Sequence, residues 1–215
     1  MSKQVYKSFT KPHPIYKLIQ NKKWGVALLP LPNTFEEYLT GKSKQALRTN
    51  RKHALSRGFH FERFDPKQRI LEILSINSSL PSRQGKLMNA SYLDISKLEM
   101  LYAEIPNMFG VFDKGDCLKA YAYTPICGEF FVFSRLLGHA DNLEDGVMYL
   151  LMSEIIREMI VIKNNKSDPK WAMYDTFFGA TLGLQYFKKR LGFQPYKVIW
   201  QWVERKHNPR ESISQ

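Results

Sequence analysis

The amino-acid sequence predicts an α/β fold in which a mixed, mostly antiparallel and twisted sheet is flanked by helices. Three strand-like segments follow one another at residues 108–112, 118–126 and 130–137, and the short turns between them are typical of antiparallel hairpins. A long amphipathic helix is predicted next, over residues 146–163. The chain then alternates between strand, helix and strand over residues 171–204, which makes the sheet one of mixed direction.

Length and composition indicate a globular chain with a strong positive charge. The 215 residues include 14 Phe and 11 Tyr, so the chain can build a large core without disulfides or a structural metal. Its formal net charge is +12. A field of that sign attracts anionic partners, but it does not choose among nucleic acid, anionic lipid and a phosphorylated cofactor.

The sequence favours a cytoplasmic protein without a membrane span. Its longest apolar segment, residues 147–162, is interrupted by three charged residues, and the start MSKQVYKSFT lacks the apolar core of a signal peptide. Cys117 and Cys127 lack the spacing of metal ligands, and so few cysteines favour a reducing compartment. We therefore expect no metal.

Three parts are expected along the chain. Residues 1–23 are basic and contain two prolines, so they are predicted to form an N-terminal arm that packs loosely on the body. Residues 24–204 are expected to form a single domain, because no linker-like stretch or internal repeat interrupts them. Residues 205–215 are expected to be a polar tail.

The first half of the domain is predicted to alternate between strands and helices. Asn33 or Thr34 can cap a short helix, because the glutamates that follow complete a capping-box pattern. The helix over residues 42–57 is dense in Lys and Arg and ends at Gly58, a favoured residue for a helix terminus. In chain order, the expected elements are a strand at 24–31, the capped helix before 41, the basic helix at 42–57, a strand at 59–64, and helices at 66–77 and 94–104.

The start of the long helix is a candidate anion site. The first backbone N–H groups of a helix lack intrahelical partners, and together with the helix dipole they suit a pyrophosphate. Here they would be the amides of Gly146, Val147, Met148 and Tyr149. The two acidic residues before Gly146 can equally cap the helix without any ligand, so both interpretations stay open.

A second candidate position lies after the strand predicted at residues 171–174. Asp175 is either a turn former or a carboxylate that acts as a base at the open edge of the sheet. Tyr186 lies on the helix predicted at 181–190, where its hydroxyl either protonates a leaving thiolate or simply lies at the rim of the sheet. A final strand is expected at residues 197–204.

The polar loop over residues 78–90 supplies candidate acceptor contacts, because long irregular loops in compact domains are often functional. Arg83, Gln84 and Tyr92 are the polar groups selected in and beside it. Arg83 is suited to a carboxylate or phosphate of an acceptor, and the alternative is a solvated loop. The sequence has no GxSxG, P-loop or GxGxxG motif that would indicate other chemistry.

Several segments resemble a known family. The predicted hairpin series followed by a helix that opens at Gly146, and the run GLQYFKKRLGFQPYKVIW, are similar to the acyl-CoA module of the GNAT (GCN5-related N-acetyltransferase) superfamily. The resemblance is greatest to its FemAB-like branch and covers roughly residues 34 to 203. The segments that carry this second resemblance are the basic helix, Asp175-Thr176 with Phe178-Gly179, and Gly183-Leu184 with Phe187-Lys188.

The resemblance implies a GNAT-like acyltransferase that moves an acyl group from acetyl-CoA or another acyl-CoA to an amine on a small molecule or peptide. We expect the amide of Leu136 to polarise the acyl carbonyl, and Asp175 and Tyr186 to be catalytic. Tyr174 and Phe178 are expected to contact substrate.

Three alternatives remain open at this stage. The usual Q/R-x-x-G-x-G/A donor signature is absent, and enzymes of the FemAB-like branch take an aminoacyl group from tRNA, which suits the positive charge. The basic helix at 42–57 could instead make the chain a non-enzymatic nucleic-acid-binding module. The third alternative is a GNAT-like scaffold without activity.

Overall fold

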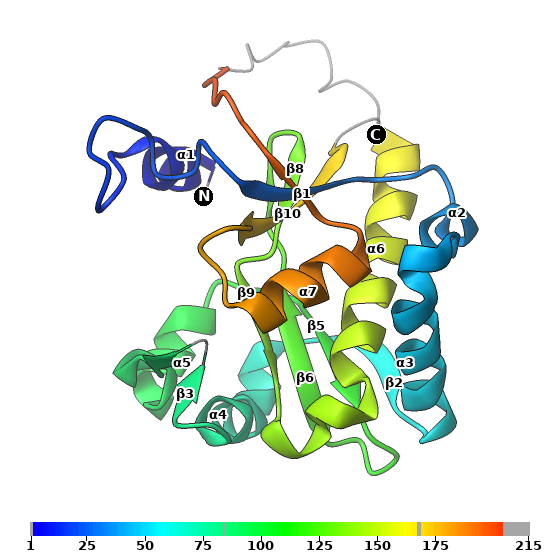
Figure 1. Cartoon of the computed structure of the whole chain (residues 1–215). Helices are drawn as coiled ribbons and strands as arrows, with labels where there is room; N and C mark the ends of the chain where they lie inside the picture. The colour runs from blue at the N-terminus through cyan, green and yellow to red at the C-terminus, as the bar shows by residue number, and fades with distance from the viewer. Residues whose placement is uncertain (1, 84, 167–168, 204–215) are drawn as a thin grey trace, which may run out of the picture.

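The computed structural model describes residues 2–83, 85–166 and 169–203, and Figure 1 shows helices packed around two groups of strands. The main helices are α1 (Ser2–Thr10), α2 (Phe35–Leu39), α3 (Gln45–Ser56), α4 (Ile70–Ser78), α5 (Ile95–Tyr102), α6 (Val147–Lys166) and α7 (Leu182–Leu191). The strands are β1 (Val26–Pro30), β2 (His60–Phe64), β3 (Ser82–Arg83), β4 (Lys86–Leu87), β5 (Met108–Phe112), β6 (Leu118–Tyr123), β7 (Ile126–Cys127), β8 (Phe130–Val132), β9 (Arg135–Gly138), β10 (Trp171–Thr176) and β11 (Gln194–Tyr196).

The strands form a five-stranded sheet in the order β11-β1-β10-β8-β7 and a four-stranded sheet in the order β2-β5-β6-β9. β3 and β4 form a separate small hairpin. β8 and β10 run parallel, whereas the other described pairs are antiparallel. The predicted fold class, a mixed and mostly antiparallel α/β fold flanked by helices, is therefore confirmed.

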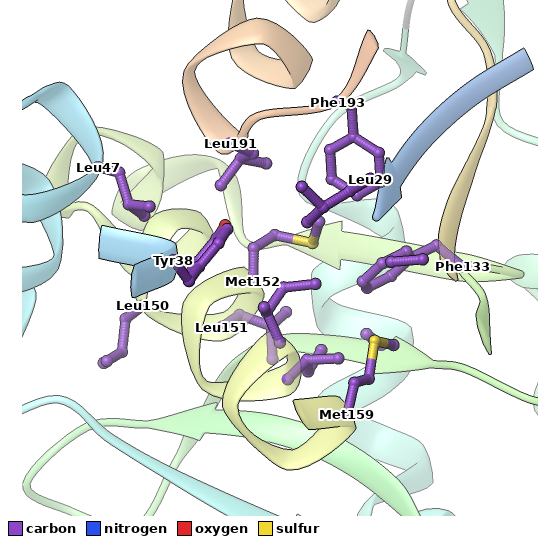
Figure 2. Close-up of a cluster of buried hydrophobic side chains, with 14 of the residues drawn as sticks. Leu29, Tyr38, Leu47, Phe133, Leu150, Leu151, Met152, Met159, Leu191 and Phe193 are labelled. Atoms are coloured by element: carbon purple, nitrogen blue, oxygen red, sulfur yellow. The ribbon is translucent and has the colours of Figure 1, made fainter. Parts of the chain in front are cut away.

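The long helix α6 is the centre of the largest core cluster. It contacts α3 and α7 as well as strands β5 and β6 of the four-stranded sheet, so its buried residues extend around much of its circumference. Figure 2 shows Leu150, Leu151, Met152 and Met159 of α6 within this cluster. The labelled side chains around them come from five other parts of the chain: Leu29, Tyr38, Leu47, Phe133, Leu191 and Phe193. Truncation of one such buried leucine to alanine costs about 2–5 kcal/mol.

Local capping signals are confirmed at the first helix of the domain. The Thr34 hydroxyl accepts a hydrogen bond from Glu37 N at 3.1 Å, and the Glu37 carboxylate accepts one from Asn33 N at 3.0 Å. Thr34 is thus the cap, and Asn33 contributes only its backbone N–H. The basic helix is α3 preceded by a short 3-10 turn at Lys42–Lys44, and it is followed by Gly58 at φ +86°.

The predicted arm contains a helix that the sequence analysis missed. In α1, Phe9 packs on Trp200 with ring centres 5.1 Å apart, and Tyr6 packs on Trp202 at 5.6 Å. The partners are almost two hundred residues away in sequence, so no local pattern identifies them. The division into arm, domain and tail stays a prediction, and residues 205–215 lie outside the described residues.

The prediction of a final strand at residues 197–204 is wrong for residues 197–203, and residue 204 lies outside the described part of the chain. The strand is β11, which pairs with the amino-terminal part of β1 at the edge of its sheet. An edge position tolerates Pro195, which has no N–H to donate. After β11, Val198 N donates to Lys23 O at 2.8 Å and Trp200 Nε1 to Lys22 O at 2.5 Å, without a regular ladder.

In residues 2–83, 85–166 and 169–203, no helix combines the length and apolar character needed to cross a membrane.

Candidate active site

The strand predicted at 130–137 is in fact two strands that belong to different sheets. β8 runs beside β10, and Phe133 N donates to Met173 O at 2.9 Å. At the next residue, Ser134 N donates to Tyr123 O at 3.0 Å, and β9 continues as the edge of the four-stranded sheet. The last residues of β10 therefore diverge from β9. We call this opening the strand split.

One backbone donor of β9 points into the strand split. His139 N donates to Lys119 O at 2.8 Å, so residues 119 and 139 form a hydrogen-bonded pair. Such pairs alternate with non-bonded ones along an antiparallel ladder. Counted back along the register, the Leu136–Ala122 pair is non-bonded. The Leu136 N–H is therefore directed away from β6, toward the side on which β10 diverges.

A hollow of about 360 Å³ adjoins the strand split. Ser134 lines it from the side of β9, Met173 and Asp175 line it from β10, and α1 covers another side. Lys22 completes the wall and forms an ion pair with Asp175. The hollow thus combines an apolar base with one positive and one negative side chain.

Asp175 adopts a backbone conformation that is uncommon for residues other than glycine. Its φ is +50°, in the left-handed region, and its carboxylate is 59% exposed. Strained residues of this kind concentrate at functional sites. The conformation alone does not mark a site, because Asp116 in the β5–β6 turn has φ +60° and an Arg69 partner.

Lys188, which the sequence indicated only as part of the FemAB-like resemblance, is a further candidate site residue. It is 1% exposed, its Nζ donates to Thr176 O at 2.8 Å, and it lies 4.5 Å from the centre of the Tyr174 ring. Burial lowers its pKa to about 8, while Asp175 opposes that shift. A sequence signal existed, because Leu184, Lys188 and Leu191 share one face of α7 at helical spacing.

The other predicted residues of this region separate into two groups. The Tyr174 ring lies 5.7 Å from that of Phe133, and burial raises its pKa. Tyr186 is 62% exposed and two residues from Lys188, which directs it to a different face of α7. Phe178 is 68% exposed and lies against Gly25. Tyr174 therefore packs against the main core and its neighbour Asp175 lines the hollow, whereas Tyr186 and Phe178 are directed outward.

The start of α6 has a structural explanation that needs no ligand. Gly146 has φ +82°, and a Cβ there would stand 2.3 Å from Asn50 O, so only glycine lets α3 approach this closely. Asp145 beside it is buried and pairs with Arg57 at 2.8 Å. Val147 is buried in the core.

The next two residues of α6 face different neighbours. Met148 lies against Gly138 of β9, and Tyr149 packs on Phe187 with ring centres 5.0 Å apart. Tyr149 N already bonds to Gly146 O at 3.0 Å. The amides of Val147 and Met148 are the ones that precede this first helical bond.

The loop residues chosen for acceptor binding lie on the side of α4 and α5. Arg83 Nη2 donates to Ile76 O at 2.8 Å and to Ser79 Oγ and Gly138 O, both at 3.1 Å. Tyr92 is half-buried, and its carbonyl accepts from Asn77. Gln84 lies outside the described residues. Arg83 thus ties α4 to the end of β9.

Most cations of the basic helix are engaged within the fold. Arg51 Nη2 pairs with Glu154 at 2.6 Å, Arg57 with Asp145, and Arg48 caps carbonyls at the end of α2. Lys44 is buried, donates to Leu191 O, and has its pKa lowered to about 8 by burial. These contacts weaken the interpretation of this helix as a nucleic-acid-binding face.

Comparison with solved structures identifies the fold. The chain superposes on FemX with a TM-score of 0.59 at 13% identity, over 80% of this chain and 59% of that one. A conserved protein of unknown function from Bacteroides thetaiotaomicron gives 0.56 at 14% identity, over 81% of this chain and 58% of that one. The C-terminal domain (DUF2156) of a putative lysylphosphatidylglycerol synthetase from Agrobacterium fabrum gives 0.52 at 15% identity, over 80% and 58% respectively.

These likenesses show that the chain shares its fold with these three structures. The chain spans just under three fifths of the length of each of these structures. No family model matches the sequence. No curated protein matches it either.

Proposed function

We propose that this chain is an acyltransferase that transfers an acyl group to an amine acceptor at the strand split. The observation that carries the proposal is the arrangement of donors and charges there. The Leu136 N–H is directed into the split from β9, while Asp175 and Lys188 stand at the diverging end of β10. The resemblance noted in the sequence supports this proposal, because a GNAT-like fold contains an opening of the same kind.

The proposed roles follow from the charges. The acyl carbonyl oxygen accepts from the Leu136 N–H, and the buried Lys188 ammonium stabilises the negative charge that develops on that oxygen. Asp175 holds the acceptor ammonium in place of Lys22 and takes its proton. The amine nitrogen then attacks the acyl carbon, the new C–N bond forms, and the bond to the leaving oxygen or sulfur breaks. The nitrogen then gives up its second proton, the leaving group takes up one proton, and the proton held by Asp175 is released to solvent.

We favour an aminoacyl ester on tRNA as the donor. The buried Asp145 carboxylate beside the start of α6 disfavours a pyrophosphate, and Gly146 is explained by packing against Asn50. Exposed cations at the end of α7 lie close by, because Arg190 reaches the Tyr149 hydroxyl at 3.4 Å. Acetyl-CoA or another acyl-CoA is the second candidate, since the amides of Val147 and Met148 precede the first helical bond of α6.

The deciding experiment gives the purified chain each donor in turn, with a mixture of amino acids and short peptides as acceptors. One arm supplies tRNA charged with radiolabelled amino acids and the other supplies radiolabelled acetyl-CoA. Label should move to an acceptor from the charged tRNA. Transfer from acetyl-CoA alone would select the second donor, and no transfer from either would contradict the proposed function.

A matched pair of variants ties the activity to the site. Asp175→Asn should lower the transfer rate at least tenfold, because the acceptor loses its partner for the ammonium and the proton. Asp116→Asn is the control, since Asp116 shares the left-handed conformation and a basic partner but lies in the β5–β6 turn. Equal rates for the two variants would remove Asp175 from the mechanism.

A further inference from the structure

Buried polar atoms without a partner gather in one place beside the strand split. In the part of the chain that the structure describes, four buried side-chain nitrogen or oxygen atoms lack a hydrogen-bond partner. Three of the four are Arg83 Nε, the Tyr102 hydroxyl and Arg135 Nε, and of these the Tyr102 hydroxyl still interacts with that of Tyr121. Folded proteins leave few such atoms unpaired, because each costs the full desolvation of a polar group. Their concentration therefore needs an explanation.

The three groups belong to a single cluster. The Arg135 guanidinium carbon lies 5.2 Å from the centre of the Tyr102 ring and 5.8 Å from that of Tyr123. Tyr121 interacts electrostatically with both Arg83 and Arg135. Its own hydroxyl donates to Asn77 Oδ1 at 2.7 Å. We call this set the arginine–tyrosine cluster: Arg83, Tyr102, Tyr121, Tyr123 and Arg135.

The cluster holds two cations and no anion among the residues described. Arg83 is fixed by three acceptors on one nitrogen, all of them uncharged, and its Nε is left over. Arg135 has neither a carboxylate nor a hydrogen-bond acceptor in the described residues, and it is held only against the tyrosine rings. Burying guanidinium groups without a counter-charge is unfavourable. A bound anion would supply that charge and the missing acceptors.

We propose that the arginine–tyrosine cluster binds a carboxylate or phosphate group of the acceptor. Arg135 presents its guanidinium to the anion, the Tyr102 hydroxyl donates a hydrogen bond, and Arg83 adds positive charge while staying attached to α4 and β9. The planar guanidinium suits both anions, because each offers paired oxygens.

The position of Arg135 connects this subsite with the strand split. Arg135 follows Ser134, which lines the hollow that contains Asp175. Successive side chains of an extended chain face opposite sides, so the acceptor would pass over the edge formed by β9, with its amine at the hollow and its anionic group at Arg135. An acceptor that carries both an amine and an anionic group can thus reach the two parts together. Amino acids and short peptides have this chemistry. The assignment to the acceptor rests on the proposed function, whereas the anion site itself does not.

The test measures binding without any donor, by NMR titration of the labelled full chain. The probes are alanyl-alanine, its C-terminal amide, and inorganic phosphate. Replacing the carboxylate of the dipeptide by the amide should weaken binding at least tenfold. Arg135→Gln should weaken binding of the preferred anion by a similar factor.

Two further variants separate recognition from folding. Tyr102→Phe removes a buried hydroxyl whose polar neighbour is the hydroxyl of Tyr121, so it should change the melting temperature little and still weaken anion binding several-fold. Arg63→Gln is the matched control and should bind as the wild type does. Arg63 also stacks on an aromatic ring of the same sheet, that of Phe109 at 4.9 Å, but it already has Glu158 as a partner.

The outcomes distinguish the ligand and the two proposals. Arg135-dependent binding of the dipeptide assigns a carboxylate subsite, and Arg135-dependent binding of phosphate alone assigns a phosphate subsite. Equal affinity of the wild type and Arg135→Gln, or no binding of either anion, overturns the inference. Anion binding without any acyl transfer would leave the subsite in place and contradict only the proposed function.

Discussion

The Lys188 ammonium of α7 lies 4.5 Å from the centre of the Tyr174 ring of β10, while its Nζ donates to the carbonyl of Thr176 at 2.8 Å. The lysine is buried and has no carboxylate in direct contact among the described residues, so the ring face and one carbonyl replace the water it would otherwise bind. Burial lowers the pKa of Lys188 to about 8, which brings its titration into an accessible pH range.

The first prediction concerns the pH dependence of acyl transfer. If the Lys188 ammonium stabilises the developing oxyanion, the rate should fall as pH rises through about 8, where that group loses its proton. Lys188→Arg should remove this falling limb, because a guanidinium stays charged throughout the range. Rates of the wild type and the variant from pH 6 to 10 provide the measurement. An unchanged falling limb in Lys188→Arg would rule out this role for the residue.

The second prediction concerns stability against pH. The unfolded chain binds a proton on this lysine up to about pH 10.5, whereas the folded chain releases it near pH 8. Stability should therefore rise with pH between these values, by up to about 3 kcal/mol, because the unfolded state then binds more protons. The cost of burying the charge is fully present below about pH 8.

The check compares wild type with Lys188→Met by denaturant unfolding at pH 7.5 and pH 10. Lys44 has a similarly lowered pKa, but it is present in both proteins and cancels in the comparison. The wild type should gain stability relative to Lys188→Met when the pH is raised from 7.5 to 10. A difference that is the same at both values would show that Lys188 titrates normally.

The third prediction concerns the packing role of Gly146. Gly146→Ala should destabilise the fold by about 2–3 kcal/mol, because alanine is strained at φ +82° and its Cβ meets Asn50 O at 2.3 Å. Gly183→Ala is the control, since nothing among the described residues lies within 4 Å of the place that a Cβ would take there in α7. It should be neutral or stabilising by up to about 1 kcal/mol. Thermal and urea unfolding of the two variants measure the contrast.

Local patterns in the sequence were sufficient for much of the fold. The periodicity of residues 146–163 predicted α6, and the cap at Thr34 was confirmed together with its glutamate partner. Such features depend on neighbours within a few residues, which a sequence displays directly. The burial of Lys188 is also indicated by its spacing from Leu184 and Leu191.

What the sequence could not supply were choices between distant partners. Residues 130–137 alternate like one strand, yet Phe133 bonds to β10 and Ser134 to β6, and this switch creates the strand split. The sequence does not show that Gly146 lies against Asn50, because this is a tertiary contact. The glycine was therefore interpreted as part of a donor-binding loop. Arg135, the partner of Arg83 in the arginine–tyrosine cluster, has no signal in the sequence, because its unpaired state is visible only in three dimensions.

The last prediction concerns the ion pair between Lys22 and Asp175. In the structure Lys22 pairs with the Asp175 carboxylate, which is also the proposed partner of the acceptor ammonium. The two cations therefore compete for Asp175. Lys22→Met should lower KM for the acceptor by a factor of about 1.4 to 5, the range expected for a partly exposed ion pair worth about 0.2–1 kcal/mol. The rate at saturating acceptor should stay within about twofold of the wild type.

The control is Lys97→Met, because Lys97 pairs with Asp94 at 3.6 Å on α5, well separated along the chain from β10. Steady-state kinetics against acceptor concentration give both numbers. An unchanged or raised KM in Lys22→Met would mean that the amine does not bind at Asp175, and the acceptor would then have to be placed elsewhere in the strand split.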